Sequence, residues 1–253
     1  MLNIAAIQFD IQWEAPAKNR SILEPIIRKH STADLIILPE MFNAGFTTNV
    51  KIAAEENEGP TVQWMVALAK ELDCAICGSI PTKLNNRYTN RFYWVEANQI
   101  YFYDKKHLFG YGKESEVYSA GDEQLIVDFK GWKIMPLICY DLRFPVWSRN
   151  TQGYDLLLYV ANWPSARASA WNQLLRARAI ENLSFVCGLN RIGQDGVGLN
   201  YLGDSALIDY AGKDLVCLDD KEAVLTYSLS KKDMLAFRDK FNFLNDRDKF
   251  TLA

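Results

Sequence analysis

Short apolar runs rich in β-branched residues recur along the chain and alternate with segments of helical periodicity. Some runs are almost wholly apolar, as strands buried on both faces are, and others alternate with polar residues, as half-buried antiparallel strands do. The predicted strands lie at residues 3–9, 34–38, 74–80, 91–97, 100–105, 124–129, 132–140, 155–162, 184–190, 205–210, 215–220 and 224–229. Turn signals at 97–99, 130–131 and 211–213 separate several neighbouring runs.

Helical patterns cover residues 17–30, 60–72, 168–182 and 231–243. Pro60 suits the first turn of its helix, whereas Pro25 is predicted to kink or shorten the first one. Strand–helix and hairpin connections both occur, which favours an α/β fold with a mixed sheet or a two-sheet sandwich flanked by helices. No repeat or linker is visible, so residues 1–253 are interpreted as a single domain.

Composition narrows the possible partners and cofactors. The formal net charge of −3 gives no electrostatic argument for nucleic acid or an anionic membrane as a partner. No targeting segment is visible, and no apolar stretch is long enough to cross a membrane. The five cysteines do not have the spacing of a disulfide framework. We therefore expect a cytoplasmic protein. Only His30 and His107 are present, so we predict neither a metal site nor a cofactor.

Cys139 is the first candidate for chemistry. It follows the apolar run 134–138, and the segment 143–145 has the pattern of a helix start. A cysteine at a strand-to-helix corner faces helix N-terminal amides, which lower a thiol pKa and can bind an oxyanion. The alternative is a buried core cysteine, the commoner role of a free thiol.

Glu40 and Lys105 also end predicted strands. Glu40 follows the apolar residues 35–38 and precedes two large apolar side chains, which would partly desolvate the carboxylate and make it a better base. Lys105 could neutralise a developing oxyanion, while strand alternation directs Lys106 to the opposite face. The alternatives are a solvated loop acid and a lysine-rich surface turn.

Three segments in this order, LPEMF (38–42), DKKHLF (104–109) and ICYDLRFP (138–145), resemble the carbon–nitrogen hydrolase (nitrilase) superfamily. The resemblance matches that family's Glu–Lys–Cys triad to Glu40, Lys105 and Cys139. It matches a second glutamate, thought to orient the lysine, to Glu114. The resemblance covers nearly the whole chain. The segments most like the ω-amidase branch are 161–164, 170–182, 190–196 and 203–212, together with 109–114 and 145–150.

The resemblance implies a four-layer α-β-β-α sandwich that dimerises into an eight-layer αββααββα stack. The partner subunit would then pack on the C-terminal aromatic residues Phe241, Phe243 and Phe250.

The same resemblance implies a mechanism. Glu40 would accept the Cys139 proton, and the thiolate would attack a carboxamide carbon to give a thioester. Lys105 and the backbone N–H of Tyr140 would hold the oxyanion. A small-molecule amide is the implied partner.

For the ω-amidase branch, the expected substrates are 2-oxo acids with a terminal amide, such as 2-oxoglutaramate or 2-oxosuccinamate. Their far carboxylate needs a cation, and Arg167 is the leading candidate because guanidinium binds carboxylate in a bidentate fork. Arg167 could equally cap or ion-pair the following helix. Phe46, Asn162 and Trp163 could line the pocket or serve only in packing, and Arg143 is interpreted as a support for the cysteine corner.

Several alternatives stay open. One is a papain-like Cys139–His107 hydrolase, although His107 is interpreted as a hydrogen-bonded structural residue. Others are a non-catalytic scaffold, or a nitrilase, aliphatic amidase, carbamoyl hydrolase or N-acyl transferase on the same fold.

Cys74 and Cys77 are predicted to lie on opposite faces of one strand, which argues against a redox or zinc site.

Overall fold

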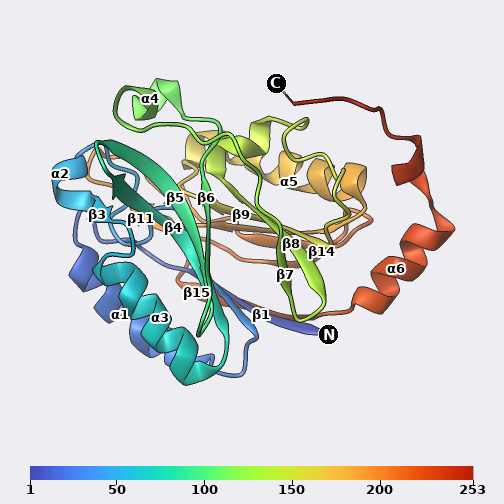
Figure 1. Cartoon of the computed structure of the whole chain (residues 1–253), viewed down its shortest axis with the longest axis horizontal. Helices are drawn as coiled ribbons and strands as arrows, with labels where there is room; N and C mark the ends of the chain where they lie inside the picture. The colour runs from blue at the N-terminus through green and yellow to red at the C-terminus, as the bar shows by residue number, and fades with distance from the viewer. Residues whose placement is uncertain (253) are drawn as a thin grey trace.

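The computed structural model describes residues 1–252, and two β-sheets stacked face to face form its centre (Figure 1). The first sheet contains β1 (Leu2–Gln8), β2 (Leu35–Ile37), β3 (Glu55–Glu56), β4 (Ala75–Leu84), β5 (Arg87–Val95), β6 (Ile100–Asp104) and β15 (Ala223–Leu229). Its strand order is β15-β1-β2-β4-β5-β6, and β3 also pairs with β4. Strand β2 runs parallel to both β1 and β4.

The second sheet contains β7 (Val127–Phe129), β8 (Trp132–Ile138), β9 (Leu156–Ala161), β10 (Phe185–Asn190), β13 (Ala206–Ile208) and β14 (Asp214–Cys217). Its order is β14-β13-β10-β9-β8-β7, with β8, β9 and β10 parallel. A separate hairpin joins β11 (Ile192–Gln194) to β12 (Asn200–Leu202).

Helices cover the outer faces of the two sheets (Figure 1). The α-helices are α1 (Pro16–Lys29), α2 (Val50–Ala53), α3 (Pro60–Leu72), α4 (Glu114–Val117), α5 (Ala168–Asn182) and α6 (Lys231–Lys240). The short 3₁₀ segments are η1 (Gly110–Gly112), η2 (Cys139–Arg143), η3 (Ser165–Arg167) and η4 (Phe243–Asp246). None of the helices in the described part of the chain has the length and apolarity that crossing a bilayer requires.

The apolar pattern of the strands explains the layering. In β2, Leu35 and Ile37 belong to the core between the sheets, while Ile36 faces the core beneath α1 and α3. Both faces are buried, so the run is continuously apolar. On the second sheet, α5 packs closely on Gly188, where a Cβ would lie 2.4 Å from Leu175. The result is the α-β-β-α arrangement that the resemblance implied.

Two local predictions need correction. Helix α1 is not shortened at Pro25 and continues to Lys29, because Pro25 lies on the exposed face and the Ser21 carbonyl that loses its partner can bond to water. No α-helix begins at Arg143, since the turn after β8 is the 3₁₀ segment η2, which ends there. The prediction for Cys74 and Cys77 is confirmed, because they belong to the cores on opposite faces of the first sheet.

Candidate active site

Glu40, Lys105 and Glu114 meet in one fully buried cluster near the strand ends. Glu40 follows β2, Lys105 follows β6 and Glu114 opens α4, and each side chain is 0% exposed. The Lys105 Nζ lies 2.9 Å from Glu40 Oε1 and 2.9 Å from Glu114 Oε2. Removing one member of such a buried set typically costs about 3–5 kcal/mol, because a charge is left uncompensated.

The two carboxylates accept further hydrogen bonds from neutral donors. Asn90 Nδ2 lies 2.8 Å from Glu40 Oε1 and 3.0 Å from Glu114 Oε1. The backbone N–H of Asn162 donates to Glu40 Oε2 over 2.8 Å, and that of Phe109 donates to Glu114 Oε2 over 2.6 Å. Each donor favours the charged form of the carboxylate it reaches.

Lys105 is held as a cation. Burial by itself would lower the pKa of this ammonium, but the charges of Glu114 and Glu40 outweigh it and raise the pKa above its ordinary value. Burial raises the pKa of Glu114, and the neighbouring Lys105 charge opposes that shift. The site therefore contains a fixed positive charge in a water-poor environment, where such a charge acts strongly on a developing anion.

Cys139 begins η2 with a backbone φ of +44°, a strained value for a residue with a side chain. Its Sγ lies 3.8 Å from the carbonyl oxygen of Asn162. Burial, followed by the charge of Glu40, raises the pKa of the thiol well above its ordinary value. The expectation that helix amides would lower this pKa is therefore wrong, and the resting group is a neutral thiol that needs a base.

The backbone N–H of Tyr140 lies in the first turn of η2, where N–H groups have no acceptor within the helix. Its side chain lines the same pocket as Cys139 and Lys105. One backbone N–H without a helical acceptor and one ammonium group therefore belong to residues that line the same pocket as the Cys139 thiol.

The side chain of Asp141 holds the turn that contains Cys139 in place. Its Oδ2 accepts hydrogen bonds from the Ile138 N–H and the Tyr103 hydroxyl, and its Oδ1 contacts His107 Nδ1 at 2.8 Å. The His107 ring stacks on Phe144 with centroids 3.6 Å apart. These contacts confirm that His107 is a hydrogen-bonded structural residue.

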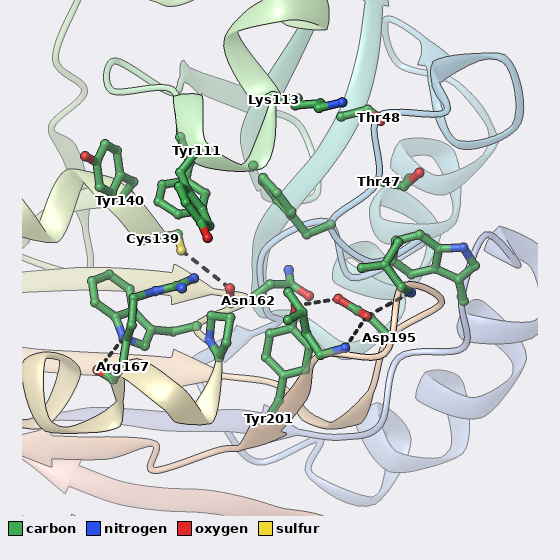
Figure 2. A pocket seen from close by; sticks show the side chains of 18 of the residues that line it. Thr47, Thr48, Tyr111, Lys113, Cys139, Tyr140, Asn162, Arg167, Asp195 and Tyr201 are labelled. Carbon is green, nitrogen blue, oxygen red and sulfur yellow. Dashed lines mark hydrogen bonds between the residues drawn. The ribbon is translucent and has the colours of Figure 1, made fainter.

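Cys139 opens into a pocket of about 520 Å³, which Figure 2 shows at close range. All four residues predicted to bind substrate, Phe46, Asn162, Trp163 and Arg167, line it. Sequence reasoning missed other residues of its wall, among them Trp13, Tyr111, Asp195, Val197, Leu199 and Tyr201. These residues come from three segments that are distant in sequence, one around Trp13, one at η1 and one at residues 195–201, and no local pattern places the segments together.

Two guanidinium groups belong to this pocket wall. Arg143 lies 5.0 Å from the ring centre of Trp163, and Arg167 lies 5.1 Å from that of Phe109. Within residues 1–252, neither forms an ion pair, and the Arg167 side chain makes no helix-capping hydrogen bond. Arg143 lines the pocket, and the Leu142 carbonyl of the cysteine corner accepts a hydrogen bond from buried Arg178 over 2.6 Å.

No group of three or more His, Cys, Asp or Glu side chains within residues 1–252 is arranged to hold a metal ion. What the described site contains is an acid, a buried ammonium and a thiol beside a pocket with two arginines. Such a set suits nucleophilic attack on a carbonyl-like carbon.

Comparisons with known proteins agree with this geometry. The carbon–nitrogen hydrolase family model matches residues 3–239. Omega-amidase YafV of Escherichia coli K12 is 41% identical over 99% of this chain and 98% of its own length. The 2-oxoglutaramate amidase of Bacillus subtilis is 33% identical over 96% of each chain.

Solved structures give the same result. XC1258 of Xanthomonas campestris, a CN-hydrolase superfamily protein with an arsenic adduct in its active site, has a TM-score of 0.97 and 43% identity. That alignment covers 100% of this chain and 99% of the other. An amidase from Nesterenkonia sp. AN1, 22% identical, shares the fold with a TM-score of 0.83 over 96% and 98% of the two chains. The chain belongs to the carbon–nitrogen hydrolase family.

Proposed function

We propose that this protein is an ω-amidase that hydrolyses the terminal carboxamide of small 2-oxo acids, such as 2-oxoglutaramate or 2-oxosuccinamate, to the acid and ammonia. One observation carries the proposal. A thiol beside a buried Glu–Lys–Glu cluster shares its pocket with Arg143 and Arg167, which form no ion pair within residues 1–252. This fits a substrate with an amide at one end and a carboxylate at the other. The names of the two curated relatives supply the substrate class.

In the first half-reaction, Glu40 takes the proton of the Cys139 thiol while the sulfur attacks the amide carbon. The carbonyl oxygen becomes an oxyanion, which the Lys105 ammonium and the Tyr140 N–H stabilise. The C–N bond then breaks, and the departing nitrogen receives the proton from Glu40 and leaves as ammonia. Cys139 is left as a thioester, and Glu40 is again a carboxylate.

In the second half-reaction, Glu40 takes a proton from water, and the resulting hydroxide adds to the thioester carbon. The second tetrahedral oxyanion meets the same two donors. Its collapse breaks the C–S bond and releases the acid, and the Glu40 proton returns to the sulfur. Glu114 acts through Lys105, because its carboxylate holds the ammonium at 2.9 and 3.0 Å.

The geometry disfavours the papain-like alternative. His107 is engaged with Asp141 through Nδ1, and its ring is stacked on Phe144. A raised thiol pKa also suits removal of the proton by Glu40 during attack rather than a resting thiolate–imidazolium pair. The intact acid, ammonium and thiol set argues against a non-catalytic scaffold.

A substrate panel tests the proposal. Ammonia release from 2-oxoglutaramate and 2-oxosuccinamate should exceed that from glutamine by about 100-fold in kcat/KM, because the two guanidinium groups repel the α-ammonium of glutamine. Formamide, which lacks the carboxylate, should be turned over slowly, and an aliphatic nitrile not at all. Turnover of the nitrile without turnover of any amide would overturn the amidase assignment.

The substitutions Arg143→Gln and Arg167→Gln test which arginine binds the substrate carboxylate, and they should leave the chemical steps unaffected. Loss of a charge-assisted hydrogen bond should raise KM for 2-oxoglutaramate by about 10- to 100-fold for whichever arginine holds the carboxylate, with kcat within about threefold. Formamide is the matched control, since its kcat/KM should be unchanged in both variants. If neither variant changes KM for the 2-oxo acid, neither arginine is the carboxylate-binding residue.

We further propose a cytoplasmic homodimer. The five cysteines are free thiols, which suits a reducing compartment. Phe241 packs between Phe237 and Phe243 in tilted contacts, with ring centroids 4.8 and 5.8 Å apart, and Phe243 and Phe250 are 59% and 40% exposed. Such exposed aromatic side chains beyond α6 suit burial against a second copy. Sedimentation equilibrium at micromolar concentration should give the dimer mass, and a monomer would contradict this proposal.

A further inference from the structure

Asn90 is a fully buried amide that reaches both glutamates of the site from strand β5. Its single Nδ2 group donates one hydrogen bond to Glu40 Oε1 and one to Glu114 Oε1, over 2.8 and 3.0 Å. An amide nitrogen carries two hydrogens, so this bridge uses its full donor capacity. Asn90, like Glu40 and Glu114, is not among the residues that line the pocket, and its amide nitrogen contacts those two carboxylates.

The orientation of this amide is fixed by Ser79. The Ser79 hydroxyl lies 2.8 Å from Asn90 Oδ1 and accepts the backbone N–H of Met41 over 2.9 Å. Since the hydroxyl accepts from Met41, its own proton is free to go to Asn90 Oδ1, and the Asn90 nitrogen must then face the carboxylates. Met41 directly follows Glu40 and has a φ of +44°. Through Ser79, the backbone turn that carries Glu40 is therefore hydrogen-bonded to the same amide that holds the Glu40 carboxylate.

The bridge determines which oxygen of Glu40 remains available. Glu40 Oε1 already accepts from Lys105 and Asn90, whereas Oε2 accepts one short hydrogen bond, from the Asn162 N–H at 2.8 Å, and has a longer contact with Asn162 Nδ2 at 3.5 Å. Oε2 therefore retains acceptor capacity for an incoming proton. The bridge also places a donor between two anions that share one ammonium, so it opposes their mutual repulsion.

We propose that Asn90 is a positioning residue of this active site, whose amide holds Glu40 and Glu114 in place beside Lys105 and leaves Glu40 Oε2 to receive the thiol proton. The inference rests on the proposed role of Glu40 as base. The hydrogen bond from Asn90 opposes the burial-driven rise in the pKa of Glu114, which agrees with it.

Other titratable groups facing the two carboxylates do not obscure the effect. They are Lys105 after β6, Cys139 in η2 and Tyr118 after α4. The pKa of each is raised above its ordinary value, so none of them gains or loses a proton on the acidic side of neutrality. An acid limb in the pH dependence of kcat/KM therefore reports the carboxylates.

Asn90→Leu tests the proposal, because leucine has nearly the same shape and donates nothing. A carboxylate that loses a donor binds its proton more tightly, so activity should fail at a higher pH. We expect the acid limb of kcat/KM to move up by about 1–2 pH units and kcat at neutral pH to fall about 10- to 100-fold. KM should stay within about threefold. Ser79→Ala, which keeps the amide but frees its orientation, should shift the limb in the same direction by less.

Asn150→Leu is the matched control, since Asn150 is equally buried but bonds only to Tyr154 and Asn182. It should lower Tm without moving the acid limb. A loss of kcat in Asn90→Leu with the wild-type pH profile would overturn the proposal. If that variant does not fold, Ser79→Ala decides in the same way.

An infrared pH titration of the buried carboxyl C=O band needs no substrate and separates this inference from the proposed function. The band is assigned by its loss in Glu40→Gln and Glu114→Gln. In Asn90→Leu or Ser79→Ala it should appear at a higher pH than in the wild type. Appearance at the same pH would overturn the role of Asn90, whereas absence of amide turnover with a shifted band would overturn only the proposed function.

Discussion

Cys139→Ala should lower kcat for 2-oxoglutaramate hydrolysis by about 10⁴-fold or more, the largest effect expected of any single substitution in this chain. Without the sulfur no thioester forms, and only direct attack by water at the Lys105 site remains. Ammonia release under single-turnover conditions measures the loss. The fold should be retained, because removing one small side chain at the pocket wall leaves the buried Glu40–Lys105–Glu114 cluster intact.

Cys187→Ala is the matched control. Cys187 is a buried thiol in β10, in the core between the sheets, and does not line the pocket. Its loss should reduce stability by about 1–2 kcal/mol, as small core truncations do, and leave kcat within about twofold. Residual activity in Cys139→Ala within a hundredfold of wild type would mean that the thiol is not the nucleophile.

Glu40→Gln should lower kcat by about 10³-fold, whereas His107→Asn should change it by less than about tenfold. Glutamine keeps the shape of Glu40 and can still accept from Lys105, but its amide cannot take the thiol proton. Asparagine at 107 retains a donor for Asp141, so the turn behind the nucleophile keeps its support. Steady-state kinetics with 2-oxoglutaramate and a pH profile for each variant measure the contrast.

The reverse order of effects would contradict this account. If His107→Asn abolished activity and Glu40→Gln preserved it, the chemistry would be of the papain type, and the buried acid–ammonium cluster would be structural. Equal, modest losses in both variants with a lowered Tm would indicate general destabilisation. Circular dichroism melts of both proteins separate these cases.

Much of the architecture could be predicted from the sequence, because buried strands require apolar residues, and runs of these are visible in the sequence. Each of the twelve apolar runs overlaps a strand, since a strand buried on one or both faces carries apolar residues at its buried positions. The prediction failed where structure depends on distant partners. β4 and β5 extend to an exposed turn at Asn85-Asn86 through polar residues, and β11 and β12 are three-residue segments without an apolar pattern.

Some residues of the active site could be predicted from local sequence, and others could not. Glu40, Lys105 and Cys139 could be found because each ends an apolar strand and belongs to a recognisable segment. Asn90 could not, since it lies in the polar extension of β5 that no pattern assigned to a strand. The place of Arg143 in the pocket wall could not be predicted, because local sequence does not distinguish a 3₁₀ turn from the start of an α-helix.

The central claim is that the buried acid and ammonium act on the sulfur of residue 139 to form a covalent acyl intermediate. Intact-mass spectrometry of the wild type, quenched in acid within milliseconds of mixing with 2-oxoglutaramate, tests it most directly. We predict a mass increase equal to the substrate minus ammonia, located on the peptide that contains Cys139 and lost after hydroxylamine treatment. Rapid ammonia release with no adduct on that peptide, or an adduct at another residue, would contradict the account.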